Sequence, residues 1–146
     1  MRALYTSAVV LLALGTAAPL AAQADTAAAP VTMPADSLAH ARKLTEWFFT
    51  AQFDSLHRWL TPEMRERRTP ASLQEDLDQL VSRAGLESEV VEEKFVKRNG
   101  QTQYWRTGRY TIFPEPVLFR WAFDKQGRIG GMGLGPASSP PPIDPD

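Results

Sequence analysis

The stretch "ESEVVEEKFVKRNGQTQYWRTGRYTIF" (residues 87–113) determines how the second half of this chain folds. Both of its halves are rich in residues that are favoured in β-strands: valine and phenylalanine in the first half, and threonine, tyrosine and other aromatic residues in the second. Asn99 and Gly100 lie between the halves, and these two residue types readily take the positive φ angles of a two-residue hairpin turn. The stretch therefore predicts an antiparallel β-hairpin.

Two further strands are expected after this hairpin. In "VLFRWAFD" (117–124), alternation places four apolar side chains on one face: Val117, Phe119, Trp121 and Phe123. A tight turn at 125–127 leads to "RIGGMGL" (128–134), whose three glycines predict a bulge or a closely packed neighbour. The four strands together predict an antiparallel meander.

Before residue 87 the apolar residues recur at three- and four-residue steps, which indicates helices. The first stripe consists of Leu38, Ala41, Leu44, Trp47, Phe48 and Ala51. Asp36 or Ser37 can cap its first turn. Thr-Pro pairs at 61–62 and 69–70 predict two further capped helix starts, and Gly85 predicts the end of the last helix.

This order predicts an α+β fold, in which N-terminal helices pack on a curled four-stranded antiparallel sheet. We expect the strand face that carries Phe119 and Trp121 to meet the helical stripe that carries Trp47 and Phe48.

The segment "FDSLHRWL" (53–60) contains the three side-chain types of a hydrolase triad, in Asp54, Ser55 and His57. A triad requires these groups to converge from different elements, whereas neighbours on one helical turn diverge. The chain also has no G-x-S-x-G motif. We therefore predict that Asp54 caps a short helix, and we assign no catalytic residue.

The two ends of the chain differ in composition from its middle. Arg2, an apolar run at 8–14 and a small-residue site at 22–24 are typical of a secretory signal peptide, so we assign residues 1–24 to one. Residues 25–35 are expected to form a flexible tether, 36–135 the folded domain, and 136–146 a disordered proline-rich tail. These features predict a periplasmic or secreted protein without a membrane span.

The overall composition argues against several classes of function. The chain has no cysteine, only two histidines, and a net charge of −1. We therefore expect no metal site and no cofactor, and no attraction to nucleic acid through bulk charge.

Aromatic and guanidinium groups are concentrated on the predicted strands, and these types suit an acidic or planar ligand. The candidate ligand-binding residues are Trp47, Tyr104, Arg106, Tyr110, Arg120 and Trp121. Arg120 falls on the face opposite Phe119, which leaves open a second role as a cross-strand partner of a glutamate such as Glu92.

Two motifs carry a resemblance to a known family. Phe53, Leu56, Leu60, Thr61, Pro62 and Met64 match a helical F-x-x-L-x-x-x-L-T-P-x-M segment, and a closing hairpin motif is matched by Asp124, Gly127, Ile129, Gly131 and Met132. The chain thereby resembles small exported bacterial domains of the nuclear-transport-factor-two-like, or cystatin-like, superfamily. The resemblance implies a sheet that curls round the long helix into a cone, whose open end holds a small apolar molecule.

Members of that superfamily include isomerases, dehydratases and cyclases as well as modules without chemistry. The enzymes need an acid or base inside the cone, and here no acidic residue is expected beside Phe119 and Trp121. We therefore expect a non-catalytic module that binds a small apolar or acidic ligand, a peptide, or a second copy of itself. The alternative is a small isomerase, dehydratase or cyclase that uses Tyr104 or Tyr110.

Overall fold

The computed structural model describes residues 36–145, so the predicted signal peptide and tether lie outside the described residues. Four helices precede four strands, which confirms the α+β class. Their bounds are α1 Ser37–Phe49, α2 Phe53–His57, α3 Pro62–Arg67, α4 Pro70–Ala84, β1 Glu87–Arg98, β2 Gln101–Tyr110, β3 Val117–Phe123 and β4 Ile129–Pro136.

The predicted caps of three helices are confirmed. Asp36 Oδ1 accepts from the Ala39 N–H at 2.9 Å, and the hydroxyls of Thr61 and Thr69 accept in the same way at the starts of α3 and α4. Gly85 follows the end of α4 with a φ of 82°, a left-handed conformation that glycine adopts without strain. These side chains therefore set where the helices begin and end.

Two predicted details of the first helices are wrong. The α1 helix ends at Phe49, and Ala51 has a φ of 56°, which ends the helical path before the predicted last residue of the stripe. Asp54 does not cap α2, because the helix begins at Phe53, two residues before the start that an Asp54 cap implies. Gln52 occupies the capping position without a side-chain hydrogen bond. The carboxylate of Asp54 lies instead in the first turn, where the helix dipole favours it.

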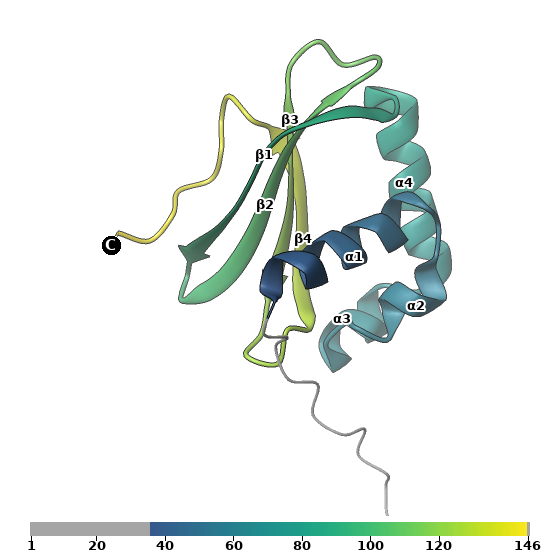
Figure 1. The fold of residues 1–146 in the computed structure, drawn as a ribbon. Helices are drawn as coiled ribbons and strands as arrows, with labels where there is room; N and C mark the ends of the chain where they lie inside the picture. Colours follow the sequence, from purple (N-terminus) through teal and green to yellow (C-terminus); the bar gives the residue numbers. More distant parts are fainter. Residues whose placement is uncertain (1–35, 146) are drawn as a thin grey trace, which may run out of the picture.

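The sheet is an antiparallel meander in the order β1-β2-β3-β4, as predicted. The Asn99–Gly100 turn joins β1 to β2, and both turn residues have positive φ. All four helices lie on one side of the sheet (Figure 1). The sheet twists but is not strongly curled, so the predicted curled sheet is corrected to an open one with one face covered by helices.

The core lies between α1, α4 and the inner face of the sheet, by which we mean the face toward the helices. The Phe48 ring of α1 lies 5.4 Å from the Phe119 ring and 6.0 Å from the Trp121 ring, between centroids. The expected meeting of this strand face with the helical stripe is therefore confirmed at Phe48. Trp47 is only partly buried and packs at the margin of the core.

The start of β4 is tied to the α2–α3 connection. The Ile129 N–H donates to the Trp59 carbonyl at 2.7 Å, and the Thr61 N–H donates to the Ile129 carbonyl at 2.9 Å. The sheet register shifts beside Gly130, which confirms the bulge predicted from the glycines. The two family-like motifs thus meet here.

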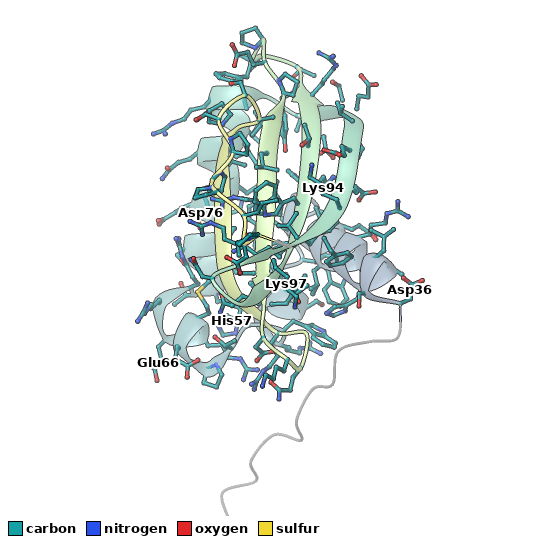
Figure 2. The ribbon with its side chains drawn as sticks, turned by 90° about the vertical axis from the view of Figure 1, so that its left-hand side faces the viewer. Asp36, His57, Glu66, Asp76, Lys94 and Lys97 are labelled. Atoms are coloured by element: carbon teal, nitrogen blue, oxygen red, sulfur yellow. The ribbon has the colours of Figure 1, made fainter. Side chains whose placement is uncertain are left out.

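The segment after β4 crosses the outer face of the sheet, away from the helices (Figure 2). It is fixed at both ends: the Ala137 N–H donates to the Pro116 carbonyl, and the Asp144 carboxylate accepts from the Asn99 and Gly100 N–H groups at 2.8 Å each. The sequence predicts a disordered tail at 136–146 and none of these contacts.

Among residues 36–145, no helix is both long and apolar enough to cross a lipid bilayer.

Candidate ligand-binding site

A cleft of about 700 Å³ opens between α1, α4 and the first two strands. We call it the inner cleft. Phe49, Leu77, Val81 and Leu86 supply apolar wall, while Arg42 and Thr45 of α1 and Glu87 and Arg106 of the sheet supply polar wall. Apolar walls with a few convergent polar groups are the usual construction of a small-molecule site.

Arg106 is the centre of the polar wall. Its guanidinium binds the Glu87 carboxylate through two hydrogen bonds, from Nε at 3.0 Å and from Nη2 at 2.5 Å. Its Nη1 donates to Glu93 at 3.2 Å. A planar guanidinium can donate two parallel hydrogen bonds to one carboxylate, and this bidentate pairing fixes the geometry of both groups. Arg106 therefore holds two glutamates of β1 in place.

Glu93 has two further partners. Arg42 of α1 donates to the Glu93 carboxylate from Nε at 2.9 Å and from Nη2 at 2.6 Å. The Tyr104 hydroxyl donates to the same carboxylate. The Glu93 side chain is only 11% exposed. We call Arg42, Glu87, Glu93, Tyr104 and Arg106 the charge network. Its two carboxylates and two guanidinium groups balance in charge.

The charge network shifts the pKa values of its members. Burial alone would raise the pKa of Glu93, but the hydrogen bonds from Arg42 and Tyr104 outweigh burial and lower it. The pKa of Tyr104 is raised by burial and by its hydrogen bond to Glu93. The pKa of Arg106 is raised, chiefly by its hydrogen bond to Glu87. Glu93 is therefore ionised and Tyr104 is neutral at physiological pH.

The hydroxyl of Tyr110 is a buried polar atom without a partner in the described part of the chain. Tyr110 is 6% exposed and follows Arg106 on the inner face of β2. Burial and the nearby charge of Glu87 raise its pKa, so the hydroxyl is neutral at physiological pH and can donate a hydrogen bond. A buried hydroxyl without a partner costs stability, and a bound water or ligand can supply the missing hydrogen bond.

Gly108 makes the network possible sterically. A Cβ at this position would lie 2.4 Å from Glu87 Oε1, closer than real Cβ contacts allow. Because Gly108 has no side chain, the Glu87 side chain can pass over the Gly108 backbone and reach Arg106.

The structure separates the six predicted ligand-binding residues. Tyr104, Arg106, Tyr110 and Trp121 lie on the inner face of the sheet, and Arg120 lies on the outer face. Arg106 borders the inner cleft, whereas Trp121 is enclosed in the core at 1% exposure. Trp47 lies on α1, with the Lys43 Nζ 5.7 Å from its ring centroid.

Sequence reasoning missed Glu87 and Glu93, and the expectation that no acid lies on the inner face is wrong. The signal for Glu93 was present: counting back from the Asn99–Gly100 turn pairs residue 93 with residue 106, as observed. For Glu87 no such count works, because two register shifts intervene. Both acids lie on β1, whereas the expectation rests on the apolar faces of the 117–123 strand and of the first helix, which carry no acid.

The proposed pairing of Arg120 with Glu92 is also wrong. Strand β2 lies between β1 and β3, so the two side chains are separated by a whole strand. Glu92 binds Lys94 at 3.0 Å instead, and Arg120 lies opposite Trp105 and Gly133.

No group of three or more His, Cys, Asp or Glu side chains within residues 36–145 is arranged to hold a metal ion. We compared the chain with models of protein families, with curated proteins and with solved structures, and none of these comparisons found a match.

Proposed function

We propose that this protein is a non-catalytic module that binds a small amphipathic molecule in the inner cleft. The observation that carries the proposal is the buried Tyr110 hydroxyl, which has no partner among residues 36–145 and lies close enough to Glu87, in the wall of a cleft with apolar sides, for that charge to raise its pKa. A ligand of this kind places its apolar body against Phe49, Leu77 and Val81. Its polar group meets the Glu87–Arg106 pair, and a bridging water can extend this contact to the Tyr110 hydroxyl.

The ligand is expected to be uncharged or to carry balanced charges. Arg106 has already committed three of its N–H groups to Glu87 and Glu93, and the charge network has no net charge. An acidic ligand would also meet the Glu46, Asp78 and Glu87 carboxylates that line the cleft, and these repel a like charge.

The charge network favours binding over catalysis. A general base in the cleft needs a pKa near the working pH, whereas hydrogen bonding lowers that of Glu93. Both glutamates are also held by guanidinium groups. The alternative of an isomerase, dehydratase or cyclase therefore has the residue types it needs, but the lowered pKa makes Glu93 a weak base.

The resemblance to the nuclear-transport-factor-two-like superfamily and the predicted export remain part of this proposal. In this view the cleft between α1, α4 and the sheet corresponds to the open end of the cone, in a periplasmic or secreted protein.

Self-association is the second candidate function, and the exposure of β1 favours it. This edge strand carries Val90, Val91 and Phe95 on its surface, with exposed fractions of 41%, 48% and 37%. An unpaired edge with apolar side chains can pair with a second copy.

Native mass spectrometry of gently purified protein tests both candidates. A retained mass of a few hundred daltons is expected, and the same spectrum gives the number of subunits. Ser82→Phe places a large ring at the cleft wall without changing charge, so this variant should lose the retained molecule. Gln74→Phe, on the same helix but away from the cleft, should keep it. Retention that is equal in both variants, or a bare protein throughout, would refute the proposal.

A further inference from the structure

The outer face of the sheet carries two arginines beside a shallow hollow. Arg98 ends β1 and Arg120 lies in the middle of β3, and both border a hollow of about 210 Å³ together with Gln101 and Gln103 of β2. The floor at β4 consists largely of glycines, so peptide backbone is exposed there. This hollow lies on the opposite side of the sheet from the inner cleft.

Arg98 and Arg120 lack the acidic partners that other arginines of the sheet have. Arg106 binds Glu87 and Arg109 binds Glu89, whereas neither Arg98 nor Arg120 forms an ion pair within residues 36–145. The Arg98 Nε donates to the Pro142 carbonyl at 3.0 Å. Burial, together with the charge of Arg98, lowers the pKa of Arg120. The two positive charges therefore repel each other across the hollow.

One described carboxylate, that of Asp144, lies close enough for Arg98 to contribute to its lowered pKa. Its oxygens accept from the turn N–H groups of Asn99 and Gly100, and its single negative charge offsets only one of the two positive charges. The hollow thus keeps an excess of positive charge.

The geometry of the hollow is built around the Arg120 guanidinium. A Cβ at position 133 would lie 2.4 Å from Arg120 Nη2 and 2.8 Å from Cζ, so the missing side chain of Gly133 lets the guanidinium rest on β4. Gln103 is 5% exposed, and its carbonyl oxygen accepts from Trp105 Nε1 at 3.0 Å. This bond fixes which end of the amide is the oxygen, and the other end is the NH2 group, a hydrogen-bond donor.

We propose that this hollow binds a phosphate group, held by Arg98 and Arg120 with the Gln103 amide as a further donor. Guanidinium groups match phosphate oxygens through paired N–H donors. A phosphate dianion also neutralises both arginines, which a single carboxylate does not. This site is independent of the inner cleft.

Titration of isotopically labelled protein with inorganic phosphate at constant ionic strength tests this proposal by NMR. We expect saturable shifts of the Arg98 and Arg120 Nε–Hε signals and of the Gly131 and Gly133 amides. Acetate should bind at least roughly tenfold more weakly, since it carries one charge. An equal response to acetate would overturn the assignment to phosphate, and shifts that never saturate would overturn the site.

Two variant pairs separate a built site from general attraction of anions. Arg120→Gln should weaken phosphate binding at least roughly tenfold, whereas Arg109→Gln removes the same charge elsewhere on the sheet and should not. Gly133→Ala displaces the guanidinium without changing charge and should also weaken binding. Its matched control is Gly135→Ala, whose Cβ meets nothing within 4 Å. Equal affinities within each pair would refute the proposal.

Discussion

The indole Nε1 of Trp121 donates to Thr45 Oγ1 at 2.9 Å, which joins β3 to α1 inside the core. Each residue is only 1% exposed, so water does not compete for this bond. The Thr45 hydroxyl in turn donates to the Ala41 carbonyl at 2.8 Å. The bond to Ala41 lies within α1, so the buried Trp121 N–H is the donor that is satisfied only while α1 lies against β3.

Replacing Thr45 with valine should destabilise the protein although the shape is conserved. The change leaves the buried Trp121 N–H without an acceptor, which costs about 1–3 kcal/mol. Urea denaturation followed by tryptophan fluorescence measures the loss. Thr107→Val on β2 is the control and should change the free energy of unfolding little. Equal effects of the two changes would show that the bond is not what stabilises this position.

Truncating Trp121 should be far more damaging than truncating His57. Trp121→Ala removes a large side chain from a closed core and should cost about 3–5 kcal/mol. His57 lies at the end of α2 outside the core cluster, so His57→Ala should stay within about 0.5 kcal/mol of the wild type. The same denaturation measurement compares them, and the reverse order would mean that the strand faces are assigned incorrectly.

Glu93 should make stability depend on pH in a defined direction. Its folded pKa is lowered below the ordinary 4.5, so its contribution is present above that pH and is lost as the pH falls through the folded pKa. Glu93→Gln should therefore be less stable than the wild type at neutral pH, by about 1–3 kcal/mol. The difference should shrink in acid. Thermal unfolding of both proteins across this range measures it, and a constant difference would contradict the lowered pKa.

Gly108→Ala should disrupt the charge network without removing any charge. The new Cβ displaces the Glu87 carboxylate from Arg106, and we expect a loss of about 1–3 kcal/mol. In a Glu87→Ala background the same change should be neutral or slightly stabilising, because alanine restricts the unfolded chain more than glycine does. An unchanged penalty in that background would assign the cost to the backbone instead.

Local chemistry explains which parts of the fold could be predicted. Thr61, Thr69 and Gly85 act on their own helix ends, so their roles follow from sequence neighbours. The Asn99–Gly100 turn sets the register of the hairpin nearby, and alternation along β3 identifies its buried face.

The candidate site depended on information that local patterns do not carry. Arg42 approaches Glu93 across 51 positions of the chain, and the register shifts near Glu89 and Val90 redirect Glu87 toward Arg106. The order of the strands separates Arg120 from Glu92. Each of these relationships is tertiary, so composition and periodicity could suggest the residue types of the network without its pairings.

The bond between Thr45 and Trp121 also bears on the synthesis of the chain, because 76 positions separate the two residues. When α1 leaves the ribosome, the strand that covers its apolar side has not yet been made. At about 5–20 residues per second, the wait lasts roughly 4–15 seconds. During that time Phe48 lacks its native partners Phe119 and Trp121 on β3, which makes the nascent chain a substrate for chaperones that bind apolar segments.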